Sequence, residues 1–259
     1  LEQAGFRHVH FMPHATDPAL FCGEPPETFE RDLAFVGVSM VALTAEAIDK
    51  HAHVPHVLDA VRRAFELGRV TRERYAAGMP AILDGTLLAG LNESERRNVE
   101  LLVNYEATRR QREVLARTLA PLGLEVRGDA GWQAYGVPAG GAVGYFDDLA
   151  PYYRGTKVNV NSTSLQMCYA VNQRVFDCPA AGGFLLTDNQ PDMHAFFEPG
   201  RECVLYESMD ELRDKAAFFL NHPEERAAIV RAAQRRIAAE HTHAHRLRAL
   251  ESYLKERFA

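Results

Sequence analysis

Several residue patterns that mark particular classes of protein are scarce or absent in this chain of 259 residues. It has four cysteines and no CxxC pair, so neither a disulfide framework nor a zinc finger is expected. No apolar run approaches the roughly 20 residues that cross a bilayer. We therefore expect reduced thiols in a cytoplasmic protein without a transmembrane segment.

The chain is also poor in lysine, and acidic residues outnumber basic ones. Its 29 basic residues, nearly all arginine, face 35 acidic residues, and the net charge is −6. This balance argues against nonspecific binding of nucleic acid, so no nucleic-acid partner is expected. A hydrophobic content of 47% is typical of a globular protein, either one large domain or one domain with additions.

Patterns for a metal or a dinucleotide are missing as well. His241, His243 and His245 lack the spacing of a metalloprotease site. The glycines between Val137 and Gly144 do not follow GxGxxG, the dinucleotide-binding pattern. We expect no metal and no cofactor.

Short β-prone runs do alternate with helical patterns from residue 31 onward. This alternation predicts an α/β fold with a Rossmann-like parallel sheet over residues 31–241, followed by a C-terminal helix at 242–259. Residues 1–30 contain four prolines and are interpreted as a linker with the remnant of an N-terminal lobe. The expected strands lie at residues 33–38, 124–127, 142–146, 157–161, 183–187 and 203–206.

The interval from about 42 to 122 is too long for one crossover helix, which needs far fewer residues. Apolar residues recur there at helical spacing, for example Val57, Val61 and Phe65. We expect two to four helices inserted into the first connection of the sheet. These helices could form a surface that binds a partner protein or the acceptor. Alternatively, they form a structural subdomain that only buries its own apolar residues.

Residues 157–188 combine several features of a ligand site. A β-prone run ends at Asn161 among side chains that cap helices, and the start of a helix attracts phosphate. Arg174 and Asp177 are three residues apart, on one face if the segment is helical. Gly182-Gly183 then permits a turn into a strand whose C-terminal end is a ligand-binding position in open α/β sheets.

Four sequence blocks occur in order from residue 172 onward: NQRVFDCPAAGGFLLTD, FEPGRECVLYES, ELRDKAAFFLNHPEER and EHTHAHR. They resemble the C-terminal, donor-binding half of the CgeB-type spore-maturation glycosyltransferases, which have the two-lobed GT-B fold. The resemblance covers roughly residues 124–250. It implies a nucleotide-diphosphate sugar as donor substrate, an acceptor that is a glycan, a protein or a small molecule, and an N-terminal lobe that is missing or truncated here.

The resemblance also implies roles for individual charged residues. Asp177 matches the second of two acids in group-one GT-B enzymes, the one that holds the ribose, whereas Tyr169 stands where the first acid is expected. The usual Arg and Lys after the first strand are missing from residues 35–40. Arg174, whose five donors suit phosphate oxygens, is the candidate replacement, with Lys157 as a weaker candidate.

Other residues are expected around the donor. Gln166 or Asn172 could hold the sugar hydroxyls, and the runs GDAGW and VGYFDDL match loops that approach the donor and its base. Trp132 could stack on that base or simply pack. Arg174 and Asp177 are the predicted catalytic residues. The predicted substrate-binding residues are Gly128, Asp129, Gly144, Tyr145, Lys157, Asn161, Ser162, Gln166, Asn172, Gly182 and Gly183.

Plain structural roles stand beside these functional ones. Arg174 and Asp177 could form a solvated ion pair, residues 161–164 could only cap a helix, and Gly182-Gly183 could only allow close packing. The leading hypothesis is the donor-binding domain of a glycosyltransferase. The alternatives are a noncatalytic GT-B-derived module that binds a protein partner through the helical insertion, and a nucleotide-sugar epimerase.

Overall fold

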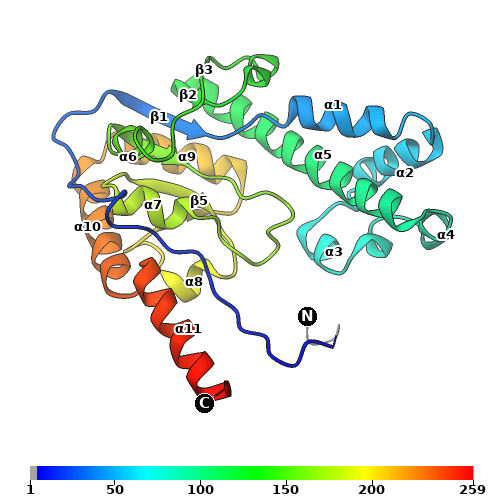
Figure 1. The fold of residues 1–259 in the computed structure, drawn as a ribbon. Coiled ribbons are helices and arrows are strands. Elements are labelled where there is room, and N and C mark those ends of the chain that lie inside the picture. Colours follow the sequence, from blue (N-terminus) through cyan, green and yellow to red (C-terminus); the bar gives the residue numbers. More distant parts are fainter. Residues whose placement is uncertain (1–4, 259) are drawn as a thin grey trace.

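The structure, a computed structural model, describes residues 5–258. Its centre is a parallel sheet, which in the described chain has six strands in the order β3-β2-β1-β4-β5-β6 (Figure 1). Every pair of neighbouring strands is parallel. The predicted α/β fold with a Rossmann-like parallel sheet is confirmed. The strands are β1 (Arg31–Val36), β2 (Leu124–Arg127), β3 (Ala139–Gly140), β4 (Thr156–Val160), β5 (Leu185–Asp188) and β6 (Val204–Tyr206).

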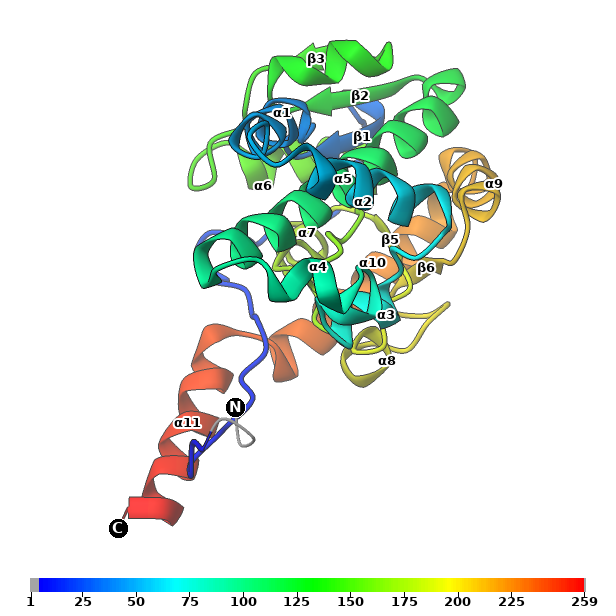
Figure 2. The same ribbon diagram turned by 90° about the vertical axis from the view of Figure 1, so that its right-hand side faces the viewer.

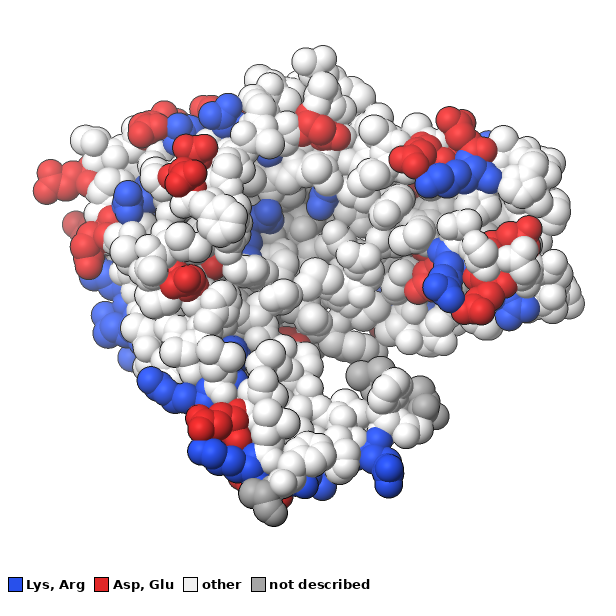
Figure 3. Space-filling view, viewed as in Figure 1, with Lys and Arg blue, Asp and Glu red and all other residues white. Residues whose placement is uncertain are grey.

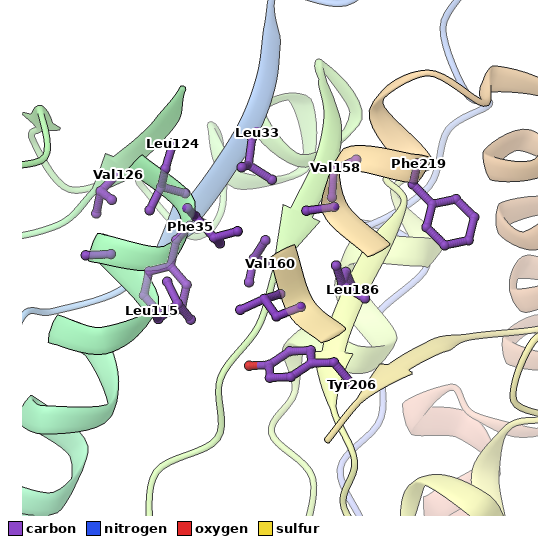
Figure 4. Close-up of a cluster of buried hydrophobic side chains, with 14 of the residues drawn as sticks. Leu33, Phe35, Leu115, Leu124, Val126, Val158, Val160, Leu186, Tyr206 and Phe219 are labelled. Atoms are coloured by element: carbon purple, nitrogen blue, oxygen red, sulfur yellow. The ribbon is translucent and has the colours of Figure 1, made fainter. Parts of the chain in front are cut away.

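Successive residues of each strand face opposite sides of the sheet, so the core has two layers. In the first layer Leu33 and Phe35 pack with Leu115, as Figure 4 shows. Ala34 faces the second layer, where it packs with Phe176. Helices α5 (Glu93–Leu119) and α9 (Met209–Leu220) cover the first side, and α6 (Leu149–Arg154) and α7 (Arg174–Ala180) cover the second.

The strand order changes direction between β1 and β4. From β1 the chain proceeds outward through β2 to β3, and it then returns to β4 and proceeds to the opposite edge at β6. Open α/β sheets bind their ligands outside the carboxyl ends of the strands at such a switch point. The loops that follow β1, β2 and β4 are therefore the first place to look for a site.

The helices between β1 and β2 form a lobe beside the sheet (Figures 1 and 2). They have an apolar cluster of their own, which includes Val57, Ile82 and Val99. Leu165, from the loop after β4, also belongs to that cluster. The expectation of two to four helices was too low. The helices are α1 (Val41–Lys50), α2 (Pro55–Glu66), α3 (Arg72–Ala76), α4 (Gly85–Ala89) and α5, with the short turn η2 (Met79–Ala81).

The two ends of the described chain meet on one side of the sheet. Thr16 pairs with Thr242 in an isolated parallel bridge, and Phe21 is buried in the second core layer. Helix α11 (His243–Phe258) extends from the body with the N-terminal segment beside it (Figures 1 and 2). The rings of His10 and Tyr253 stack there at 4.6 Å. Part of the segment interpreted as a linker therefore packs into the sheet domain.

Two local predictions are wrong. Residues 142–146 form a loop and not a strand, since the short strand β3 ends at Gly140. No helix begins at Asn161, because residues 161–173 are irregular and the next helix begins at Arg174.

None of the helices within residues 5–258 combines the length and apolarity needed to cross a bilayer. The remaining elements are η3 (Ala120–Leu122), η4 (Ala130–Tyr135), α8 (Met193–Phe196) and α10 (Pro223–Glu240).

Candidate functional site

Arg174, the first residue of α7, lies across the C-terminal ends of β1 and β4. One terminal nitrogen donates to the Val36 carbonyl at 2.6 Å, and the other donates to Oδ1 of Asn161 at 2.6 Å. Its Nε donates to the Tyr153 hydroxyl at 3.2 Å. These contacts fix the guanidinium at the point where the strand order reverses.

Asn161 and Asn172 lie directly behind this guanidinium. Asn161 is fully buried, and its Oδ1 also accepts a hydrogen bond from Nδ2 of Asn172 at 2.9 Å. Its own Nδ2 donates to the Thr187 hydroxyl at 2.9 Å. Ser162, the next residue, is buried as well. The predicted substrate-binding pair Asn161 and Asn172 therefore orients Arg174.

Arg112, on the buried face of α5, was not predicted as a site residue. It is 8% exposed and donates to the Val38 carbonyl, just beyond β1. The guanidinium carbons of Arg112 and Arg174 lie 5.8 and 5.5 Å from the centroid of the Phe35 ring. Burial, followed by the charge of Arg174, lowers the pKa of Arg112 to about 10. Arg112 therefore stays protonated at neutral pH.

A signal for Arg112 was present in the sequence. Thr108, Arg112, Leu115 and Leu119 follow one another at helical spacing, and all four are buried. An arginine in the middle of a core stripe is unusual, because charged side chains are seldom fully buried without a partner. Neither Arg112 nor Arg174 has a carboxylate oxygen within 4 Å in the part of the chain that the structure describes.

The loop after β1 completes this switch-point site, which we define as residues 37–40, Gly128, Asp129, Arg112 and Arg174. The Asp129 carboxylate accepts from the Ser39 amide at 2.7 Å and from the Ser39 hydroxyl at 2.9 Å. A side chain at Gly128 would overlap the Gly37 carbonyl. Gly128 and Asp129 therefore shape the loop between β1 and α1.

Met40 and Trp132 also belong to the surroundings of that loop. Met40 has φ of 71°, and it is the one non-glycine residue with positive φ among the described residues. Such strained backbone is frequent at functional sites. Trp132 is fully buried, and its indole nitrogen donates to the Gly37 carbonyl at 2.8 Å. Of the two roles considered for Trp132, the structure places it in packing.

Asp177 and Arg174 bond to different partners and do not form the ion pair considered above. Asp177 is 2% exposed, and its carboxylate accepts from the Thr16 hydroxyl at 2.7 Å and the Tyr145 hydroxyl at 3.1 Å. Burial raises the pKa of Asp177 to about 6, although these two hydrogen bonds oppose the shift. Gln173 donates to the Tyr145 hydroxyl at 2.5 Å. Asp177 thereby joins the N-terminal segment, α7 and the Tyr145 loop.

Gly144 precedes Tyr145 in a tight turn. Its carbonyl accepts from the amides of Asp148 and Leu149, at 3.1 and 3.0 Å. A side chain at Gly144 would come within 2.9 Å of the Asp148 carboxylate. The glycine therefore lets the loop fold back and bring Tyr145 to Asp177.

The helical lobe holds the loop that follows β4. Gln166 and Asn104 exchange two hydrogen bonds, each of 3.1 Å. Arg72 donates to the Met167 carbonyl at 2.6 Å and approaches the Asp188 carboxylate at 3.7 Å. The backbone N–H and the side-chain oxygen of Gln166 are thus bonded to Asn104 of α5. The inserted helices position the loop that leads to Arg174.

A family model described as glycosyl transferase-like matches residues 106–252. This chain belongs to the glycosyl transferase-like family. The matched region includes Arg112, Asp129, Arg174 and Asp177. It begins within helix α5 and leaves out β1 and most of the helical lobe.

Individual known proteins are similar to this chain either over a short segment or at low sequence identity. A segment of 55 residues is 44% identical to the spore protein CgeB of Bacillus subtilis (strain 168), covering 21% of this chain and 16% of CgeB. A sucrose-phosphate synthase from Thermosynechococcus elongatus has 17% identity and a TM-score of 0.46, over 55% of this chain and 41% of that one. TarM has 11% identity and a TM-score of 0.47, over 89% and 36%. This glycosyl transferase-like chain spans less than half the length of each of these proteins.

Three predicted site residues of this glycosyl transferase-like chain, Lys157, Gly182 and Gly183, lie toward the N-terminal ends of the strands. Lys157, near the start of β4, forms an ion pair with Asp32 at 2.6 Å. Gly182 has φ of +88°, and a side chain there would come within 2.8 Å of the Gly23 carbonyl. A side chain at Gly183 would come within 2.8 Å of the Tyr153 carbonyl. The two glycines thus allow close packing before β5, as their structural alternative supposed.

The surface of this family member is hollowed beside the sheet. Figure 3 shows a hollow between the sheet and the helical lobe, with basic side chains on its floor. An arginine suits phosphate oxygens because its donors lie in a fixed planar fork. The site can therefore hold a dianionic group over the ends of β1 and β4.

Proposed function

We propose that this chain is the donor-binding part of a CgeB-like glycosyltransferase with a GT-B fold, and that it binds a nucleotide-diphosphate sugar. The observation on which this depends is Arg174, held over the switch point without a carboxylate partner in the described chain. Membership in the glycosyl transferase-like family and the identity to CgeB over 55 residues support the same assignment.

In the proposed reaction, the bond between the anomeric carbon and the diphosphate oxygen breaks, and the bonding electrons stay with the diphosphate. A hydroxyl of the acceptor forms the new bond to the anomeric carbon and loses its proton to a base. Arg174 would bind the departing diphosphate and stabilise the negative charge that grows on it. Because Asn161, Val36 and Tyr153 already fix its guanidinium, little reorganisation is needed.

Asp177 is proposed to organise the nucleotide side of the site. Both of its oxygens accept hydrogen bonds, from Thr16 and Tyr145. Because Asp177 is only 2% exposed, a ribose could reach the carboxylate only if a neighbouring group moved aside. We propose that Tyr145 and its loop move when the nucleotide enters.

Isothermal calorimetry with UDP, GDP and their sugars tests the assignment. We expect one of the two nucleotides to bind, and Arg174→Lys to weaken its binding at least tenfold, since a lysine cannot reproduce the bidentate fork. Arg213→Lys, an exposed substitution on α9, is the matched control and should bind as the wild type does. If the folded protein binds none of these ligands, the donor-binding assignment is wrong and a noncatalytic module is favoured.

A product assay separates transfer from epimerisation. The protein is incubated with the sugar donor that binds, in the absence of any acceptor. A transferase should release free sugar only slowly, by hydrolysis of the donor. Conversion of the donor to a stereoisomer would instead identify an epimerase.

A further inference from the structure

We propose that Arg112 is a second phosphate-binding residue of the switch-point site, supplied by helix α5 in place of a cation from the loop after β1. The proposal rests on the proposed function, since it assumes that a diphosphate occupies this site. It gives part of the helical lobe a direct role in binding the donor.

The position of Arg112 is the first argument. The side chain leaves the buried face of α5 and reaches the loop after β1, where it donates to the Val38 carbonyl. Its Nε is buried and has no hydrogen-bond partner within residues 5–258. The arginine is therefore held by one backbone contact, and most of its donor capacity is unused.

The charge around Arg112 is the second argument. Asp129 is an acid whose charge acts on Arg112, and its two carboxylate oxygens already accept hydrogen bonds from Ser39. Arg174 adds a second positive charge on the same Phe35 ring. Burying a cation beside a like charge is costly unless a counter-ion compensates it. A diphosphate would neutralise both guanidinium groups at once.

The loop contacted by Arg112 is the third argument. It leads into α1, a helix of ten residues whose preceding residue, Met40, provides no side-chain cap, although the first amide, that of Val41, donates to the Ser39 hydroxyl at 3.1 Å. The partial positive charge of a helix N-terminus attracts anions. Residues 35–40 contain no Lys or Arg, so the cations at this loop come from elsewhere in the chain: Arg112 at Val38 and Arg174 at Val36.

The experiment compares Arg112→Gln with Arg117→Gln by calorimetry, with inorganic pyrophosphate and UDP or GDP as probes. Arg117 lies five residues further along α5, with 63% of its side chain exposed and an ion pair to Glu113. We expect Arg112→Gln to weaken the binding of pyrophosphate and of the nucleotide at least tenfold. Arg117→Gln should leave both affinities unchanged within twofold.

Thermal unfolding without ligand distinguishes binding from a structural role. Because Arg112→Gln removes a buried like charge, we expect its Tm to equal or exceed that of the wild type. A lower Tm together with unchanged affinities would overturn the proposal. Arg112→Lys, which keeps the charge, covers the case in which the glutamine variant does not fold, and it should bind pyrophosphate with intermediate affinity. A lysine variant that binds as the wild type does would contradict a role for the guanidinium fork.

The probes also separate this inference from the proposed function. If the wild type binds pyrophosphate through Arg112 but binds no nucleotide, the inference stands and the donor-binding function fails. If a nucleotide binds equally well to the wild type and Arg112→Gln, the function stands and the inference fails. Binding of neither probe contradicts both.

Discussion

The cations at the two ends of the parallel sheet differ in their burial and in their charged neighbours. At the C-terminal end, Arg112 and Arg174 share the Phe35 ring, and neither has a carboxylate within 4 Å in the described part of the chain. Toward the N-terminal end there is a cavity of about 460 Å³ lined by three cations, Lys157, Arg226 and Arg231. Lys157 pairs with Asp32, Arg226 donates to backbone carbonyls, and Arg231 is exposed to solvent. None of these three is a buried cation beside a like charge, as Arg112 is, so this cavity is not the better candidate for an anion site.

The partners of Arg226 explain the difference. Arg226 donates to the carbonyls of Phe219 and Leu220, the last two residues of α9, where the helix dipole favours a positive charge. Arg174 instead is the first residue of α7, where the partial charge of the helix end disfavours a cation. The burial of Arg112 beside the like charge of Arg174, more than the volume of a cavity, distinguishes the two ends.

The largest effect is expected from Gly128→Ala at the C-terminal end. A side chain there would overlap the Gly37 carbonyl and displace the loop after β1. We predict a loss of more than about 3 kcal/mol in the free energy of unfolding, measured by urea denaturation. Gly141→Ala is the control, because nothing lies within 4 Å of a side chain at that position. Equal stability of the two variants would show that the close approach is unimportant.

A pH-dependent effect is expected at Asp177, one turn into α7. Burial raises its pKa from 3.8 in the unfolded chain to about 6 in the folded protein. The folded state therefore binds more protons between these values, and its stability falls as the pH rises from about 4 to about 6. The shift corresponds to a loss of on the order of 3 kcal/mol.

Urea denaturation of the wild type and Asp177→Asn at pH 4, 5, 6 and 7 measures this effect. We predict that the wild type loses stability relative to the variant across that range, because the variant has no carboxylate to ionise. Parallel pH profiles of the two proteins would contradict the raised pKa.

The smallest effect is expected from Lys157→Ala at the N-terminal end. Lys157 forms an ion pair with Asp32, and the Asp32 side chain is 64% exposed, so its loss should cost less than about 1 kcal/mol. Nucleotide affinity should stay within twofold of the wild type. A tenfold loss of affinity would move the phosphate site to the opposite end of the sheet.

Much of the fold could be predicted from the sequence because strands and helices have local periodicity. Five of the six predicted strands overlap a strand of the sheet. The helix start predicted at Asn161 is absent, because the Asn161 side chain bonds to Arg174 and Thr187 and does not cap a helix.

The site was harder to predict because it depends on tertiary contacts. Arg174 could be singled out as a candidate phosphate ligand because the family's usual Arg and Lys are missing and an arginine has five donors for phosphate oxygens. Lys157 could have been set aside, since a residue near the start of a parallel strand lies at the edge opposite the ligands. The helical stripe that contains Arg112 could indicate that this side chain is buried, but not that it reaches a loop 74 residues away in the chain.

Hydrogen exchange with and without UDP or GDP tests most directly which end of the sheet binds the donor. We predict that whichever nucleotide binds slows exchange at residues 36–40 and 172–176, around Arg174, and leaves residues 182–184 and 223–231 unchanged. Protection confined to residues 182–184 and 223–231 would place the ligand in the cavity at the N-terminal end and contradict the account.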